Sequence, residues 1–218
     1  MPPKLKKESL VDQVYRRLRE EIVTMKMPLG SHVNVNELQA VLGVSCTPIR
    51  EAVNRLQQEG LITYENNVGA AVLTLEPHDV QEIQELSLTL HKEAVRLAME
   101  REDPQVLARE IGEQIERYNR AETAQDEVQA VHRLVGVFYR HCGNRRLDRS
   151  MIALQGQQLL LRQLHCGWRG HRKYDGDFRE MLRGVEERDV EAICAALEAN
   201  VRRSDPEILA HLKELTKK

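Results

Sequence analysis

The sequence predicts a mainly α-helical protein of two domains, with one small β-hairpin closing the first. At 218 residues the chain is long enough for two domains that each bury a core. Aromatic residues make up only 4% and charged residues 30%, a composition that suits helices and argues against sandwiches and barrels. Strand-like patterns occur only between residues 61 and 75. We therefore expect domains at residues 1–76 and 77–218.

Two amphipathic helices are expected at the start of the first domain. Residues 9–24 follow a candidate N-cap, Ser9, and carry apolar side chains at four-residue intervals. The segment MKMPLGSHV then breaks this helix, and a short second helix fits residues 35–42 and ends at Gly43. The apolar row of the first helix is Leu10, Val14, Leu18 and Ile22.

A third helix begins in the stretch VSCTPIREAV. Pro48 suits only its first turn, where the missing N–H has no helical partner to lose. Either Ser45 or Thr47 is expected to supply the capping oxygen. One face is apolar and packs on the domain: Ile49, Ala52, Val53 and Leu56. The opposite face is polar and free to contact a partner: Thr47, Arg50, Asn54 and Gln58.

After the third helix the pattern changes to two short strands, LITYE and AAVLTL. The turn NNVG joins them, and its Gly69 permits a positive φ. Helix, helix, turn, helix and hairpin are the layout of a winged helix-turn-helix. From Pro77 onward every pattern is helical, which predicts one all-helical bundle. Its helices are expected at residues 77–101, 104–121, 126–141, 145–165, 175–188, 190–202 and 205–216.

Charge, cysteine content and hydropathy exclude several classes of function. The net charge of −2 gives no bulk attraction to nucleic acid, so DNA binding must come from a few well-placed cations. The four cysteines form no Cys-x-x-Cys pair, and we expect free thiols. No apolar run could cross a bilayer and the start MPPKLKKES lacks a signal-peptide core, so we expect a cytoplasmic protein without membrane contact. No catalytic constellation indicates an enzyme.

Several segments follow the order and spacing of a known family. Over residues 9–75 they are SLVDQVYRRLREEI, MPLGSHV, ELQAVLGVSCTPIREAVNRLQQEGLI and NNVGAAV, and looser matches are VRLAMER, HCGNRRL and RDVEAICAALEANV. In these segments the chain resembles the GntR transcription regulators, specifically the FadR-type subgroup with an all-helical effector (FCD) domain. The resemblance implies a ligand-responsive regulator, more commonly a repressor, that binds a palindromic double-stranded DNA operator as a homodimer and responds to an unknown small-molecule effector.

The resemblance also implies which residues contact DNA. In the family an arginine usually stands where this chain has Cys46, and some members carry another where it has Asn36, so two cationic contacts are missing. Arg50 is kept and can bond a guanine edge or a phosphate through its planar fork. Cys46 either alters operator preference or is a tolerated first-turn residue, and a redox role is a third reading. The candidate DNA-binding residues are Asn36, Ser45, Cys46, Thr47, Arg50, Asn54, Asn67 and Gly69.

Many members of the subgroup hold a divalent metal with one Asp and three His, at positions that are Val131, Val135, Phe178 and Asn200 here. None of these is a usual metal ligand, so neither a metal nor another cofactor is expected. The segment HCGWRGH is read as an interhelical loop in which His165, Cys166 and His171 hold no metal. The candidate effector-pocket residues are Ser87, His91, Val131, Val135, Gln155, Gln158, Arg162, Phe178 and Asn200.

Two alternatives stay open at this point. The apolar replacements indicate either a pocket for a less polar effector or a closed cavity in a domain that serves mainly for dimerisation. An inward-pointing Arg162 would suit an anionic effector. The missing arginines and the near-neutral charge also leave room for a winged-helix protein-interaction module that has lost specific DNA binding.

Overall fold

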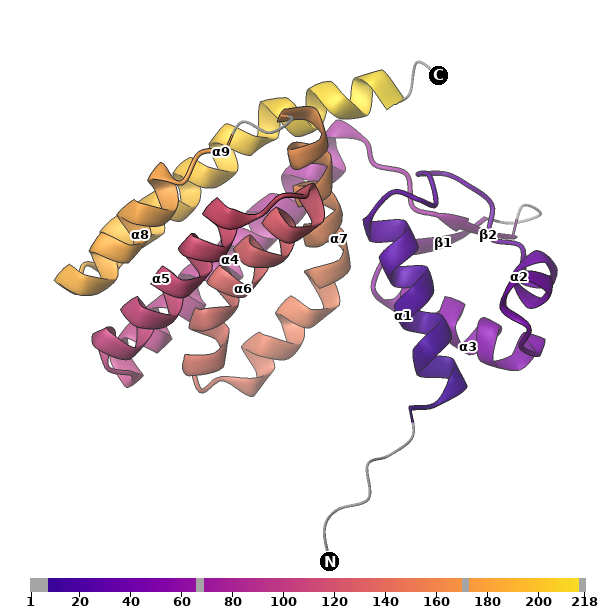
Figure 1. The fold of residues 1–218 in the computed structure, drawn as a ribbon, viewed down its shortest axis with the longest axis horizontal. Helices are drawn as coiled ribbons and strands as arrows, with labels where there is room; N and C mark the ends of the chain where they lie inside the picture. The colour runs from indigo at the N-terminus through magenta and orange to yellow at the C-terminus, as the bar shows by residue number, and fades with distance from the viewer. Residues whose placement is uncertain (1–7, 66–68, 170–172, 216–218) are drawn as a thin grey trace, which may run out of the picture. The chain divides into compact units, whose positions relative to one another are not determined.

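The computed structural model describes residues 8–65, 69–169 and 173–215, and it is mainly α-helical, as the sequence predicts. The chain divides into two compact units, Met1–Thr74 and Leu75–Lys218 (Figure 1). In the described parts, no helix combines the length and apolar content that a bilayer crossing requires.

The first unit has the helix and hairpin order of a winged helix-turn-helix. Its elements are α1 (Leu10–Val23), α2 (Val35–Leu42), α3 (Cys46–Gln58), β1 (Ile62–Glu65) and β2 (Gly69–Val72). The two strands pair antiparallel. The segment before α2, which the sequence indicates only as a break, forms a further edge of this sheet. There His32 bridges Ala71, and the N–H of Val33 donates to the carbonyl of Ala70 at 2.7 Å.

Local chemistry sets the helix ends. The hydroxyl of Ser9 accepts a backbone N–H in the first turn of α1, and the amide oxygen of Asn34 accepts two in α2. Gly43 ends α2 with a φ of 65°, a conformation that glycine adopts without strain. Ser45 is the N-cap residue of α3, but neither its hydroxyl nor that of Thr47 makes a capping bond. The prediction that one of these two hydroxyls caps α3 is therefore wrong.

A polar network fixes α3 against α1. Arg55 donates to Asp12 at 2.7 Å and lies over the ring of Tyr15, 4.2 Å from its centroid. The hydroxyl of Tyr15 bonds Glu59, which also accepts from Arg19 at 3.1 Å. Burial, together with Glu59, raises the pKa of Tyr15 to about 12, so this hydroxyl stays a donor. These contacts hold α3 in one rotation over the fully buried side chains Leu18, Ile22, Ile49 and Leu56.

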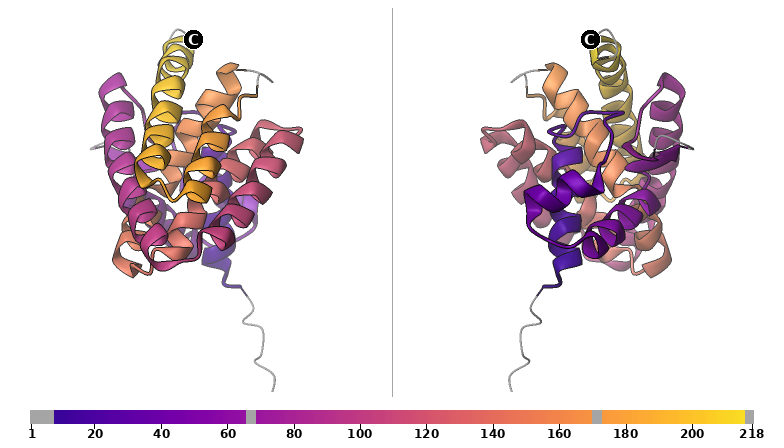
Figure 2. Two further views of the ribbon diagram at one scale, coloured as in Figure 1. Left: turned by 90° about the vertical axis from the view of Figure 1, so that its left-hand side faces the viewer. Right: turned by 90° about the vertical axis from the view of Figure 1, so that its right-hand side faces the viewer.

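The second unit is a helical bundle. Its elements are α4 (Pro77–Arg101), α5 (Pro104–Arg120), α6 (Ala124–His141), α7 (Arg145–Arg169), α8 (Gly176–Glu187) and α9 (Val190–Leu215). α5 lies along α6, and α8 lies along α9 (Figures 1 and 2). A Cβ at Gly184 would lie 2.7 Å from Cγ1 of Ile193, so the close approach of α8 to α9 requires glycine there. The core includes Val95, Leu107, Ile111, Leu134, Phe138 and Val185.

α9 runs without interruption through Pro206, where the sequence predicts two separate helices. A proline inside a helix removes one hydrogen bond and costs about 3 kcal/mol. Beyond it Ile208 and Leu212 are buried, and burying such side chains contributes roughly 1.5–3 kcal/mol each. The hydroxyl of Ser204 also donates to the carbonyl of Val201 at 2.9 Å. Tertiary burial therefore outweighs the local break, and this prediction was wrong.

α7 continues past Gly167, where the sequence predicts an interhelical loop. The ring of His211 occupies the space that a side chain at this position would need, because a Cβ there would lie 3.0 Å from its Cε1. Nδ1 of His211 lies 2.8 Å from the carbonyl oxygen of Leu164. Two of the residues predicted to lie in the loop, His165 and Cys166, are thus helical, and His171 lies outside the described residues.

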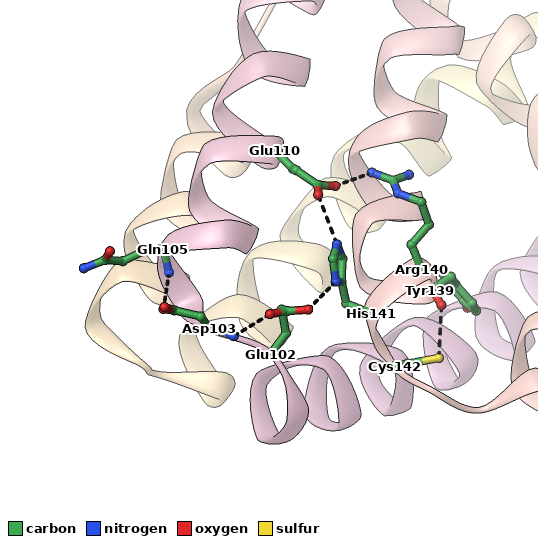
Figure 3. Close-up of polar contacts among 8 residues, drawn as sticks. All are labelled: Glu102, Asp103, Gln105, Glu110, Tyr139, Arg140, His141 and Cys142. Atoms are coloured by element: carbon green, nitrogen blue, oxygen red, sulfur yellow. Dashed lines mark hydrogen bonds and ion pairs between the residues drawn. The ribbon is translucent and has the colours of Figure 1, made fainter.

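A polar cluster joins the ends of α4, α5 and α6 (Figure 3). His141 places Nδ1 2.8 Å from Glu102 and Nε2 3.1 Å from Glu110. Glu102 accepts the backbone N–H of Asp103, which lowers the pKa of Glu102 more than His141 does. Glu110 accepts from Arg140 at 2.7 Å, and this guanidinium is the main cause of the lowered pKa of Glu110. Both carboxylates are therefore held ionised.

Acid should remove the stabilisation from this cluster. Since the pKa values of Glu102 and Glu110 in the folded protein lie below the ordinary 4.5, their contribution is present above that pH and is lost as the pH falls through the lowered values. Glu110→Gln should lower the melting temperature at about pH 6, and the difference from the unmodified protein should shrink at about pH 3.5. Circular dichroism measures both. Glu113 is exposed on α5 and has no ion pair among the described residues, so for Glu113→Gln the difference in melting temperature should not shrink at low pH. If it shrank to a similar extent, the stabilisation would not come from the Glu102 and Glu110 cluster.

Candidate functional site

The exposed edge of α3 carries polar side chains that no described residue hydrogen-bonds. Ser45, Thr47, Arg50 and Asn54 are all exposed, on the side of α3 away from its buried apolar face. None of these side chains makes a hydrogen bond or an ion pair with another described residue. Their hydrogen-bonding capacity is available to an external partner, and together they form what we call the α3 edge.

Arg50 differs from the other arginines of the first unit. Each of the others contacts a carboxylate: Arg16 contacts Glu8, Arg17 contacts Glu21, Arg19 contacts Glu59 and Arg55 contacts Asp12. Arg50 has no carboxylate partner among the described residues. The domain has almost no net charge. Among its arginines, Arg50 is therefore the one whose guanidinium is available to an anionic partner.

The remaining candidate DNA-binding residues have different surroundings. The thiol of Cys46 donates to Oε1 of Gln39 at 2.9 Å and so links α3 to α2. Asn36 is exposed in the first turn of α2. Gly69 begins β2 with a φ of 94°, the positive value that the sequence predicts. Asn67 lies outside the described residues.

The helical unit is hollow at the place where the sequence predicts an effector pocket. A cavity of about 340 Å³, which we call the larger chamber, is lined by α4, α7 and α9 among others. This is near the lower end of the volumes of small-molecule sites, about 300–1,000 Å³. The predicted residues that line it are Ser87, His91, Val131, Gln158, Arg162, Phe178 and Asn200.

A second cavity of about 210 Å³, the smaller chamber, is lined by α4, α6 and α7. The two remaining predicted residues, Val135 and Gln155, line it together with His91, Gln158 and Arg162. Every candidate effector-pocket residue therefore lines one chamber or the other, and three of them line both.

Two rings, His91 and Tyr139, and the guanidinium of Arg162 are among the polar groups that line these chambers. Nδ1 of His91 lies 2.9 Å from the hydroxyl of Tyr139. Burial lowers the pKa of His91 to about 3, with further effects from Arg162 and His132, so the imidazole is neutral at physiological pH. Burial also raises the pKa of Tyr139. Burial lowers the pKa of Arg162 only to about 10, and its guanidinium therefore stays charged.

The sequence did not identify Gln84 as part of this site. Nε2 of Gln158 lies 2.5 Å from the hydroxyl of Ser87 and 3.5 Å from Oε1 of Gln84, and Gln84 in turn donates to Asp205 at 3.2 Å. This buried chain of polar groups forms one wall of the larger chamber. Gln84 precedes Ser87 by three residues and His91 by seven, so helical periodicity could have found it.

The chambers do not fit the divalent metal of the subgroup. Val131, Val135 and Phe178 are buried apolar side chains, which offer no ligand atom. The amide nitrogen of Asn200 points to Asp177 at 3.5 Å, and Asp177 also accepts both Nε and a terminal nitrogen of Arg203. In the described ranges no three His, Cys, Asp or Glu side chains are arranged to hold a metal ion.

The α3 edge, the hairpin wing and the hollow bundle define a class of protein: a winged helix-turn-helix DNA-binding protein with a helical effector domain. The family model "Bacterial regulatory proteins, gntR family" matches residues 10–72, and the "FCD domain" model matches residues 82–203. The chain belongs to the GntR family of transcriptional regulators and carries an FCD domain, which confirms the resemblance.

Relatives carry regulator names. The chain is 30% identical to the "HTH-type transcriptional regulator McbR" of Escherichia coli K12 over 151 residues, 68% of each chain. It is 43% identical to the "Nta operon transcriptional regulator" of Aminobacter aminovorans over 79 residues, 36% of this chain and 38% of that protein. The first curated relatives are thus matched over only 38–53% of their length. These names imply a non-enzymatic role.

Solved structures share the fold. A putative GntR regulator from Rhodococcus sp. RHA1 is 18% identical, with coverage of 93% of this chain and 99% of that one and a TM-score of 0.76. E. coli McbR/YncC is 22% identical, with coverage of 94% and 98% and a TM-score of 0.70. At such identities the likeness shows the fold alone.

Proposed function

We propose that the protein is a ligand-responsive repressor that binds a palindromic DNA operator as a homodimer. Residues 1–76 are the DNA-binding domain and residues 77–218 the effector-binding and dimerisation domain. α3 lies in the major groove and the wing near the minor groove. The single observation that supports this best is the exposed α3 edge with Arg50 unpaired. Because one short helix reads few bases, two copies are needed for a specific operator.

Repression and effector response have separate support. A relative 35% identical over 95 residues, 44% of this chain and 42% of that protein, is named "Probable D-xylose utilization operon transcriptional repressor" in Paenarthrobacter nicotinovorans. The two chambers offer space for a small molecule in the FCD domain. A ligand that binds one arrangement of the domains better than another shifts DNA affinity by that difference in free energy.

Selection of genomic DNA fragments on the purified protein tests this function. Retention of fragments that share an inverted repeat, by a species with twice the mass of the chain in light scattering, is the expected result. A protein that retains no fragment at low salt would instead favour the protein-interaction module, for which the engaged thiol of Cys46 and the neutral Asn36 are the supporting observations.

Restoring the family's arginine should tighten binding. Cys46→Arg is expected to gain about 1–3 kcal/mol on the operator that other family members prefer, because a bidentate guanine contact is worth that much. Gel-shift titration measures the gain. Cys46→Ser keeps a small side chain that can still bond Gln39, so it should bind like the unmodified protein. No gain from the arginine would show that residue 46 does not face the bases.

A further inference from the structure

The larger and smaller chambers meet at a common wall. His91 from α4 and Gln158 and Arg162 from α7 line both cavities. The two α7 residues are four positions apart and so project from the same face of the helix. A ligand group that contacts this wall can therefore extend into either chamber or into both.

Arg162 is the charged group of this wall, and it has no partner among the described residues. No hydrogen bond or ion pair joins its guanidinium to any of them. The other cations around the chambers are engaged: Arg203 with Asp177, Arg140 with Glu110, and Lys173 with main-chain oxygens at the end of α5. Arg162 is half-buried and lines both cavities, so an anionic ligand there could pair with its guanidinium.

The larger and smaller chambers differ in volume, and both have partly apolar linings. The larger chamber offers Val131, Phe178 and Leu197, with Tyr118 packed edge-on against Phe178 at 5.1 Å between ring centroids. The smaller chamber offers apolar surface from Val135, Met151 and Ile152. Each chamber can therefore accept an apolar substituent of a ligand.

Gly136 lines the smaller chamber. It lies inside α6, where a glycine costs roughly 0.5–1 kcal/mol relative to alanine. Packing does not require it, since a Cβ there would meet only the end of Arg140, at 3.5 Å. Asp148 also lines this chamber and would repel a second negative charge. Asp148 therefore disfavours a second negative charge on a ligand in the smaller chamber.

We propose that the two chambers form one site for a monocarboxylate whose carboxylate binds Arg162 at the common wall and whose two apolar arms occupy the two chambers, without a metal ion. The guanidinium supplies the positive charge that a divalent ion would otherwise provide, and neutral His91 and Gln158 add hydrogen bonds. This proposal rests on the effector role proposed above and names the ligand class.

Diphenylacetate is the probe, because its carboxylate stands between two phenyl arms. Titration calorimetry in EDTA should show saturable binding of diphenylacetate to the full chain. Phenylacetate, with one arm, and diphenylacetamide, without the charge, should each bind roughly 10-fold or more weakly. Absence of binding, equal binding of the amide, or a requirement for added zinc or nickel would each overturn the proposal.

Variants separate the charge from the second arm. Arg162→Met, which keeps an unbranched stem and removes the charge, should weaken diphenylacetate binding roughly 10- to 100-fold. Arg149→Met, exposed on the same helix, should change nothing. Gly136→Leu fills the smaller chamber, so diphenylacetate should lose its advantage over phenylacetate while phenylacetate binds as before. Unchanged binding to Arg162→Met, or a retained advantage in Gly136→Leu, would contradict the proposal.

DNA binding distinguishes this proposal from the proposed function. If diphenylacetate binds and the affinity for a selected operator fragment does not change, the ligand site stands and the effector role fails. If the operator fragment is bound and diphenylacetate is not, the regulator stands and the ligand class is wrong. Fluorescence anisotropy with the labelled fragment, with and without the probe, gives both readings.

Discussion

Arg50→Gln should weaken binding to a selected operator fragment by about 1–3 kcal/mol, roughly 5- to 150-fold. Its guanidinium is exposed on the α3 edge and lacks a carboxylate partner among the described residues, so the change removes an interaction with DNA and not one within the protein. The melting temperature should stay unchanged for the same reason. Fluorescence anisotropy on the operator and on random DNA measures the effect.

The two possible targets of Arg50 give different results. Binding to a guanine edge makes the loss of affinity larger on the operator than on random DNA. Binding to a phosphate weakens both alike, and its removal makes the salt dependence shallower by roughly 0.9 log units per phosphate. Arg17→Gln is the matched control, since Arg17 is exposed on α1 and paired with Glu21. Equal losses of affinity in the two variants would show that Arg50 does not contact the DNA.

Phe138→Ala should destabilise the helical unit by about 3–5 kcal/mol, the usual effect of deleting a buried aromatic side chain. Phe138 is 1% exposed and belongs to a core to which α4, α5, α6, α8 and α9 contribute. The surrounding helices are joined at their ends by polar contacts, among them those of His141, so the cavity cannot collapse freely. Urea unfolding followed by circular dichroism gives the free energy.

The control for this substitution is Leu86→Ala on α4. Leu86 is 50% exposed, so its truncation should change the unfolding free energy by less than about 0.5 kcal/mol. Both variants need the same protein concentration, because any self-association would add to apparent stability. A loss below about 1 kcal/mol for Phe138→Ala would mean that the bundle repacks around the gap.

The sequence predicts local elements well because helical periodicity and capping are local properties. α1, α2 and α3 are found close to their expected bounds, and Gly69 has the positive φ that the turn requires. The errors arise where distant residues decide the outcome. Pro206 and Gly167 look like breaks, yet both helices continue: Ile208 is buried beyond Pro206, and the ring of His211 packs where Gly167 lacks a side chain.

Cavities are harder to predict than elements. The candidate pocket residues follow from helical faces and from the positions of the family's metal ligands, and all of them line a chamber. That there are two chambers depends on distances between α4, α6 and α7, which no local pattern encodes. The unpaired state of Arg162 among the described residues also depends on what other helices fail to bring near it.

In the first unit, the residues that anchor α3 differ from those that it exposes, so its DNA specificity could be altered without disturbing the fold. α3 is anchored by its apolar face and by Arg55 and Glu59, whereas the exposed side chains of Thr47, Arg50 and Asn54 make no hydrogen bond or ion pair with a described residue. Libraries that randomise these three positions should consist mostly of folded variants. The domain is therefore a ready framework for evolving new operator preferences.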